Sequence, residues 1–285
     1  MSASNGRVTW EQAVAELLAD PERAALARDC YYDGTELEAG QRYWGDAEWQ
    51  AVRKLMPPAA GQALDIGAGR GIVSYALARD GWRVSALEPD PSTLVGAGAI
   101  RKLAEATGYP IEVCEGHGER LPFVDGRFDL VVARQVLHHA SDLRSLLREV
   151  HRVLKPGGRL IAMRDHVISR EADLGAFHTV HPLHQRYGGE HAAVLSEYTS
   201  AIESSGLTLT RVIAPLESPI NYAPLTNEQL MDGIAQRLPR VLGFNRVARS
   251  LLRSSAVAAC AVKLLARMDH RPGRLYSFVA DRPGA

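Results

Sequence analysis

Cysteine is scarce in this sequence, and the few cysteines form no pattern. The three, Cys30, Cys114 and Cys260, lie far apart in a chain of 285 residues. A zinc site or a disulfide framework needs cysteines at short, regular spacings. Their absence argues against both, and three scattered thiols suit a reducing cytoplasm.

The sequence also lacks an excess of charge of one sign and a long apolar run. Lys and Arg number 33, and so do Asp and Glu, so no global basic bias favours a nucleic-acid partner. The longest apolar run, 256–262, is much shorter than the roughly 20 residues that a membrane-spanning helix needs. The first residues show no charged head followed by an apolar run, so no signal peptide is expected. We therefore expect a cytoplasmic protein without stable membrane insertion.

The hydrophobic pattern predicts strands that alternate with helices. The expected strands are 62–66, 83–88, 111–115, 128–133, 159–164, 207–214 and 274–280. The expected helices are 10–28, 71–80, 91–107, 141–153, 190–205, 226–237 and 244–267. Regular alternation of this kind predicts an α/β fold, with a doubly wound, mostly parallel sheet and helices on both faces.

A glycine-rich turn follows the first expected strand. Residues 64–71 read LDIGAGRG, and the helical stretch IVSYALA comes directly after them. Glycines at 67, 69 and 71 let a ligand approach the backbone closely, and the helix N-terminus offers free N–H groups. A strand, a glycine turn and a helix in this order indicate a nucleotide site.

The details of the turn narrow the choice of nucleotide. Ile72 stands where a dinucleotide fingerprint has its third glycine, which disfavours a nicotinamide oxidoreductase. No Gly-Lys-Ser/Thr ends the motif, so it is not a phosphate-binding P-loop. Glu88 lies 21 residues after Gly67, at the end of the next strand, where an acid can accept hydrogen bonds from ribose hydroxyls. The pattern suits a nucleoside that carries an amino-acid tail.

Four motifs in order make the chain resemble the class I S-adenosylmethionine (SAM) methyltransferases, in particular the ubiquinone/menaquinone-biosynthesis-like small-molecule branch. The motifs are LDIGAGRG (64–71), ALEPD (86–90), ERLPFVDGRFDLVVARQVLHH (119–139) and EVHRVLKPGGRL (149–160). The resemblance covers roughly residues 60–165. It implies a seven-stranded Rossmann-like sheet whose last strand is antiparallel and lies beside the sixth.

The order of the expected strands and helices also divides the chain, because a connection as long as 215–272 is expected to be structured. An N-terminal helical segment would occupy 1–58, and the SAM-binding core 59–214. A helical cap would follow at 215–272, before the last strand and tail at 273–285.

The same resemblance implies the residues that bind the cofactor. Those expected to contact SAM are Asp65, Gly67, Ala68, Gly69, Glu88, His117 and Arg134. His117 departs from the family, which usually has an Asp at this distance before the Pro-Phe pair. A neutral imidazole still has an acceptor nitrogen, so His117 is kept as an adenine contact.

Histidines after the fourth and fifth expected strands are the candidate catalytic residues. His138 follows the fourth strand, and Asp165 and His166 follow the fifth. Ligands of open α/β sheets bind beyond the carboxyl ends of the strands. A histidine there could serve as a general base, and the neighbouring Asp165 could orient His166. Packing is the alternative role for His138.

A third group of histidines invites a metal interpretation. His178, His181, His184 and His191 fall within fourteen residues. Pro182 breaks their helical spacing, and no cysteine or compact set of carboxylates joins them. A polar loop that lines the substrate cleft is the preferred interpretation, and no metal site is expected.

The expected cap has an unusual charge pattern. No Asp or Glu occurs from 233 to 268, whereas seven Lys or Arg residues do. Basic residues beside leucines fit a weak contact of 237–267 with an anionic surface or substrate, or simply a solvated face of a packed helix.

The sequence as a whole therefore predicts a SAM-dependent methyltransferase that acts on a small molecule through an oxygen or carbon nucleophile. The alternatives are a methyltransferase of RNA or protein, and a SAM-binding protein without catalysis. The methyl acceptor and the oligomeric state stay open at this point, because the variable cap builds the substrate pocket.

Overall fold

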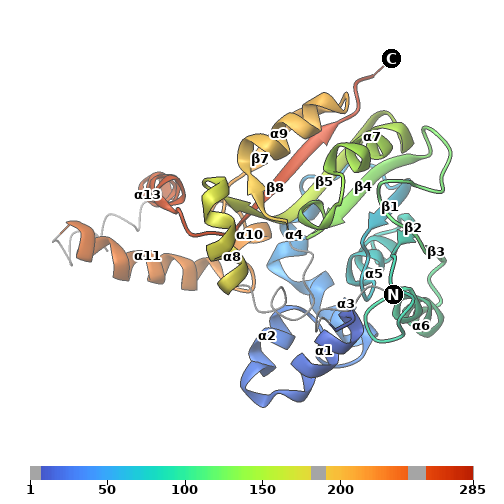
Figure 1. The fold of residues 1–285 in the computed structure, drawn as a ribbon, viewed down its shortest axis with the longest axis horizontal. Coiled ribbons are helices and arrows are strands. Elements are labelled where there is room, and N and C mark those ends of the chain that lie inside the picture. Colours follow the sequence, from blue (N-terminus) through green and yellow to red (C-terminus); the bar gives the residue numbers. More distant parts are fainter. Residues whose placement is uncertain (1–7, 181–190, 243–254, 285) are drawn as a thin grey trace, which may run out of the picture.

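The computed structural model describes residues 8–180, 191–242 and 255–284, which form a mixed sheet covered by helices (Figure 1). The sheet has eight strands, in the order β3-β2-β1-β4-β5-β8-β7, with β6 paired to β5. The strands are β1 Gln62–Ile66, β2 Arg83–Leu87, β3 Ile111–Cys114, β4 Phe128–Arg134, β5 Leu154–Ile168, β6 Ala193–Val194, β7 Thr208–Ile213 and β8 Arg274–Asp281. Among these strands of the described residues, only β8 pairs antiparallel with its neighbours.

The predicted fold class is confirmed, including an antiparallel last strand beside the sixth predicted strand, and the structure shows that it also pairs with the fifth. The number of strands differs by one, because the two-residue β6 pairs with the end of β5. This pairing also shortens the helix expected at 190–205, which begins only at Leu195. The fifth strand is longer than predicted, since it includes residues on both sides of 159–164.

Helices cover both faces of the sheet. One face carries α5 (Ile72–Arg79) and the N-terminal helices, with a core that includes Trp49, Val73 and Ile161. The other face carries α7 (Leu143–Val153) and α9 (Leu195–Ser204), with a core that includes Leu147 and Tyr198. Because both faces are covered, the central strands β1 and β4 are almost wholly buried, which explains their continuous apolar runs.

The helix expected at 10–28 is interrupted. Helix α1 (Trp10–Ala19) ends before Pro21, and α2 runs from Ala24 to Asp29. Pro21 has no backbone N–H for a continuing helix, and the Asp20 side chain caps the short turn that follows. The helix expected at 91–107 is also shorter than predicted: α6 begins at Ala97 and ends at Thr107.

Two unpredicted helices attach the N-terminal segment to the sheet domain. They are α3 (Glu36–Gly45) and α4 (Ala47–Arg53). The carboxylate of Asp80, just after α5, accepts hydrogen bonds from the indole nitrogens of Trp44 and Trp49 at 2.7 and 2.9 Å. The guanidinium of Arg53 contacts the same carboxylate. One carboxylate therefore fixes both helices.

The segment between β7 and β8 is helical, as predicted. It contains α10 (Pro219–Tyr222), α11 (Asn227–Leu242) and α13 (Ser255–Met268). The first part of the helix expected at 244–267 lies outside the described residues, and α13 accounts for the rest. Within the described ranges, no helix is long and apolar enough to cross a membrane.

A bulge in β5 decides which side chains meet at the end of the sheet. Pairing with β8 shifts between Ala162 and Asp165, and Arg164 has a positive φ of 61°. Met163 lies in the core on the side of the N-terminal helices, and Arg164 also contacts that side. The extra residue turns Asp165 toward the turn that follows β4.

Candidate functional site

The glycine turn lies at the carboxyl end of β1 and has the conformation that only glycine adopts without strain. Gly67, Gly69 and Gly71 have φ values of 62°, 54° and 82°. A Cβ at Gly67 would come within 2.6 Å of a methyl group of Val136. A Cβ at Gly69 would meet nothing nearer than a backbone oxygen at 3.9 Å. The backbone at Gly69 is therefore open to the approach of a ligand.

Glu88 lies directly beside this turn. It follows β2, and its carboxylate accepts hydrogen bonds from the backbone N–H of Gly69 at 2.7 Å and of Asp90 at 3.0 Å. The residue is only 7% exposed, and burial raises the pKa of its carboxyl. The parallel pairing of β1 with β2 brings the turn and the acid together. The acid and the turn therefore lie side by side, and the contact of Glu88 with the ribose stays a prediction.

Ala68 and Asp65 support the turn from within. The N–H of Ala68 donates to the carbonyl of Leu87 at 3.1 Å. Asp65 is 1% exposed and accepts a hydrogen bond from the hydroxyl of Ser74 at 2.6 Å. Burial raises the pKa of Asp65 to about 7. Ser74 was not predicted as part of this region, although it lies on α5, the helix that directly follows the turn.

Arg134 ends β4 and makes a buried ion pair that the sequence did not reveal. Its Nε lies 2.7 Å from Oε1 of Glu48, and its Nη2 lies 3.1 Å from Oε2. Arg164 of β5 lies 3.4 Å from the same carboxylate, and the hydroxyl of Tyr43 donates to it at 3.1 Å. Burial alone would raise the pKa of Glu48, but the two arginines hold it below its usual value.

Glu48 could not be found from sequence order. It precedes Arg134 by 86 residues and stands in a helix that the hydrophobic pattern did not predict. One carboxylate between two buried guanidinium groups leaves a net positive charge at the carboxyl ends of β4 and β5. Figure 1 shows α4 next to this part of the sheet.

His117 lies on the loop after β3 and is exposed. The start of this loop adjoins Glu88. The backbone N–H of Glu88 donates to the carbonyl of Cys114 at 3.0 Å, and the N–H of Gly116 donates to the carbonyl of Glu88 at 3.4 Å. The structure therefore places the start of this loop beside Glu88, and the contact of His117 with adenine stays a prediction.

The expected pairing of Asp165 with His166 is wrong. Oδ1 of Asp165 lies 2.9 Å from Nδ1 of His138 and 3.3 Å from the backbone nitrogen of the same residue. Both side chains are buried, at 0% and 1% exposure, and burial raises the pKa of Asp165. His138 lies in the short helical turn Leu137–His139 that follows β4, so Asp165 bonds to a histidine beside the neighbouring strand and not to His166.

His166 is held from another direction. Its Nδ1 lies 2.7 Å from the carbonyl oxygen of Gly273, at the start of β8. Its ring contacts those of His138 and Phe177, with centroids 4.7 and 5.1 Å away. The three predicted catalytic residues therefore lie together, but Asp165 reaches His166 only through His138. The role of Gly273 had no signal in the sequence.

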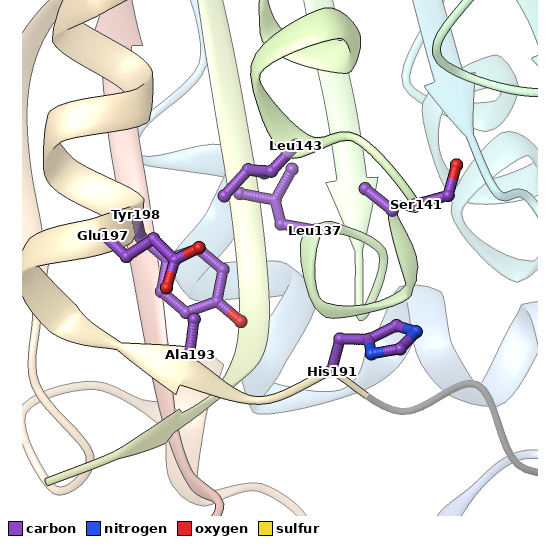
Figure 2. A pocket seen from close by; sticks show the side chains of 8 residues that line it. Leu137, Ser141, Leu143, His191, Ala193, Glu197 and Tyr198 are labelled. Carbon is purple, nitrogen blue, oxygen red and sulfur yellow. The ribbon is translucent and has the colours of Figure 1, made fainter. Parts of the chain in front are cut away.

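A cavity of about 240 Å³ lies beside this cluster (Figure 2). Figure 2 shows His191, Ser141 and Glu197 at the cavity, with Leu137, Leu143 and Ala193 as apolar neighbours. The backbone N–H of His191 donates to the carbonyl of His138 at 2.8 Å, and the hydroxyl of Tyr198 donates to the carbonyl of His166 at 3.0 Å. The walls of the cavity are thus connected to the histidine cluster.

Only part of the third histidine group lies within the described residues. His178 is in α8 (Leu174–Val180) and His191 precedes β6, whereas His181 and His184 lie outside the described residues. In the part of the chain that the structure describes, no three His, Cys, Asp or Glu side chains are arranged to hold a metal ion.

Comparison with known proteins identifies the class. The model of the family described as "Methyltransferase domain" matches residues 64–162. The ubiquinone biosynthesis O-methyltransferase of Methylobacterium sp. (strain 4-46) is 32% identical over 169 residues, which are 58% of this chain and 67% of that relative. The demethylmenaquinone methyltransferase of Mycolicibacterium gilvum is 37% identical over 139 residues, which are 48% of this chain and 55% of that relative.

Solved structures show the same fold at low identity. The cyclase SpnF matches with a TM-score of 0.56 and 20% identity, covering 99% of this chain and 85% of its own. The geranyl diphosphate C-methyltransferase of Streptomyces coelicolor A3(2) matches with a TM-score of 0.56 and 16% identity, covering 82% of this chain and 74% of its own.

The fold and the glycine turn define a Rossmann-like nucleotide-binding protein. The relatives make the class specific: the chain belongs to the class I SAM-dependent methyltransferases, in the branch of the ubiquinone and menaquinone biosynthesis enzymes. It is a SAM-dependent methyltransferase enzyme, and SAM is its cofactor.

Proposed function

We propose that this enzyme transfers the methyl group of SAM to a small molecule through an oxygen or carbon nucleophile. The observation that carries the proposal is the position of the histidine cluster, which lies at the carboxyl ends of β4 and β5, next to the strand that bears the glycine turn. The curated relatives include both ubiquinone O-methyltransferases and a ubiquinone/menaquinone C-methyltransferase, so both acceptor atoms are retained.

The cofactor side would be formed by the glycine turn and its surroundings. Glu88 would accept hydrogen bonds from the ribose hydroxyls. A carboxylate has about four acceptor positions, and backbone N–H groups occupy two of them here, so two remain for the ribose. Gly67, Ala68 and Gly69 would line the methionine part. The other proposed contacts are Asp65, His117 and Arg134, of which Arg134 would act by its positive charge beside Glu48.

On the acceptor side, His166 would be the general base. Since a carbonyl oxygen only accepts hydrogen bonds, Nδ1 carries the hydrogen that goes to Gly273. In a neutral ring, Nε2 is then the nitrogen that takes up a proton. SAM supplies an already activated methyl group, so the protein needs to align the acceptor and, for a hydroxyl, remove its proton. Asp165 would hold His138 by its hydrogen bond, and the ring of His138 would position His166 by contact.

The test begins with the acceptor. The purified enzyme is incubated with methyl-labelled SAM and fractionated metabolite, RNA and protein extracts, and mass spectrometry identifies what carries the label. We expect S-adenosylhomocysteine to form together with a labelled small molecule. Label that appears only in RNA or protein would contradict the proposal, and so would SAM binding without any turnover.

The base is tested once an acceptor is known. For a hydroxyl acceptor, His166→Ala should lower kcat by roughly a hundredfold or more without changing SAM affinity. His151→Ala is the matched control, because this histidine lies on α7 beside Gly206 and away from the cluster. An unchanged kcat in His166→Ala with a hydroxyl acceptor would remove His166 from the chemistry.

A further inference from the structure

One of the two guanidinium groups beside Glu48 lacks a carboxylate of its own. Arg134 binds both oxygens of Glu48 through Nε and Nη2, at 2.7 and 3.1 Å. Arg164 approaches the same carboxylate only with Nη1, at 3.4 Å. One carboxylate balances one guanidinium group, so the positive charge of Arg164 is left over. Burial of an unbalanced charge is unfavourable, and a bound anion would remove that penalty.

The pKa shifts of the two arginines agree with this division. Burial alone would lower the pKa of Arg134, but Glu48 raises it above its usual value. The pKa of Arg164 is lowered, because its burial and the charge of Arg134 outweigh the attraction of Glu48. Glu48 therefore balances Arg134 far more than it balances Arg164.

One edge of the Arg164 guanidinium group is held by the protein, and the other has no partner. Nη1 donates to the carbonyl oxygens of Ile220 and Ala223, at 3.0 Å each, which fixes the group in place. Nε is buried without a partner, and no group in the described part of the chain bonds to Nη2. The side chain keeps 12% of its surface exposed.

The Nε–Nη2 edge is the one with which other arginines of this protein bind carboxylates. Nε and Nη2 of Arg134 hold Glu48, and the same atoms of Arg159 hold Asp281 at 2.7 and 2.9 Å. The planar fork of these two donors matches the two oxygens of a carboxylate. Arg164 therefore presents a carboxylate-binding edge for which the described residues supply no carboxylate.

Arg164 lies on the acceptor side of the sheet. It stands in β5, two residues before His166, and β4 separates β5 from the strand that bears the glycine turn. Neighbouring strands are about 4.8 Å apart, so β5 lies roughly 10 Å across the sheet from that strand. The methionine carboxylate of SAM would stay with the glycine turn, which leaves Arg164 to the acceptor.

We propose that Arg164 binds a carboxylate group of the methyl acceptor, so that the enzyme selects small organic acids. This inference rests on the proposed function, because it names the class of molecule that receives the methyl group. The bound carboxylate would supply the negative charge that the two arginines and Glu48 lack, and it would accept hydrogen bonds from Nη2 and Nε. A neutral acceptor would leave both donors unpaired and would bind more weakly.

A labelling experiment tests the class of the acceptor. A metabolite extract is divided, and the carboxyl groups of one half are converted to amides with carbodiimide and methylamine. Both halves are incubated with the enzyme and methyl-labelled SAM. We expect a labelled small molecule only from the untreated half, and mass spectrometry should find a carboxyl group in its precursor.

The possible failures of this experiment are distinct. A labelled small molecule whose precursor has no carboxyl group overturns the inference about Arg164 but leaves the proposed function intact. The absence of any labelled small molecule from the untreated half contradicts the proposed function and overturns the inference with it.

Substitutions then assign the carboxylate to Arg164. With the identified acceptor, Arg164→Gln should raise KM roughly tenfold or more, because hydrogen bonds between charged groups are lost. Its affinity for S-adenosylhomocysteine, measured by calorimetry, should not change. Arg159→Gln is the matched control, because it removes the same charge near the other end of β5 and should leave KM unchanged.

A second variant separates charge from geometry. Arg164→Lys keeps the positive charge without the fork, so its KM should lie between those of the wild type and Arg164→Gln. Thermal melting confirms that each variant folds, and Arg164→Lys carries the test alone if Arg164→Gln does not. A wild-type KM in the folded variants overturns the inference. A loss of S-adenosylhomocysteine affinity as large as the rise in KM also overturns it, because the bound anion would then be the methionine carboxylate.

Discussion

At the scale of single residues, two glycines of the same turn have different tasks. Gly67 and Gly69 both have positive φ, so an alanine at either position costs about 1–2 kcal/mol of backbone strain. At Gly67 the new methyl group would also collide with Val136, whereas at Gly69 it would point into open space. Gly67 is therefore needed for the fold, whereas we expect Gly69 to be needed for the ligand.

This difference gives the first prediction. Gly67→Ala should lower the free energy of unfolding by more than Gly69→Ala does, as measured by urea denaturation. Gly69→Ala should nevertheless lose SAM affinity in calorimetry, because the methyl group occupies the approach to the backbone. Full SAM affinity in Gly69→Ala would show that the ligand does not approach there.

The second prediction, also at the residue scale, concerns Asp65. Burial raises its pKa from 3.8 to about 7, so the folded protein keeps a proton that the unfolded chain has lost. The stability that the folded protein gains by keeping this proton is fully present below about pH 4, and it declines as the pH rises toward 7. Asp65→Asn cannot ionise. The wild type should therefore lose up to roughly 4 kcal/mol relative to Asp65→Asn between pH 4 and pH 7.

Urea unfolding of the two cofactor-free proteins across this pH range measures the difference. Because both proteins share all other titrating groups, a parallel pH dependence would mean that Asp65 ionises normally in the folded state.

At the scale of elements, Glu48 connects three of them. It stands on α4, and its carboxylate lies between Arg134 at the end of β4 and Arg164 at the bulge of β5. Removing one partner of a buried ion pair costs roughly 3–5 kcal/mol, because the remaining charge stays buried. We therefore predict that Glu48→Gln destabilises the protein by this amount.

The control for this variant is an exposed pair. Glu115 lies 2.7 Å from Arg101, with both side chains about half exposed, so Glu115→Gln should change stability by less than about 1 kcal/mol. Limited proteolysis should also cut the N-terminal helices of Glu48→Gln faster than those of the wild type. Equal stability of the two variants would show that the glutamate does not hold these elements together.

At the scale of the whole molecule, the cofactor should stabilise the fold. A ligand at 100 times its Kd adds about 2.7 kcal/mol to the free energy of unfolding. For a chain of this length, the thermal midpoint should rise by roughly 5 °C. Glu88→Ala should reduce this rise, because each lost hydrogen bond to a carboxylate weakens binding by roughly 1.5–3 kcal/mol. If SAM raised the thermal midpoint of Glu88→Ala as much as that of the wild type, Glu88 would not bind the ribose.

The sequence by itself determined the fold class and identified SAM as the cofactor. Strand and helix periodicity predicted the doubly wound sheet, because burial on both faces leaves continuous apolar strands. Glycine spacing and Glu88 predicted the nucleotide site, because a tight turn with positive φ and an acid on the neighbouring strand are local requirements that each leave a residue type in the sequence.

Only the tertiary structure decided the partners of the charged residues. Asp165 and His166 are neighbours in the chain, yet after the bulge at Arg164 the carboxylate of Asp165 bonds to His138, whereas His166 bonds to the carbonyl of Gly273. Glu48 reaches Arg134 only because α4 packs on the sheet. Contacts between residues far apart in the chain depend on how elements pack, and no local pattern records them.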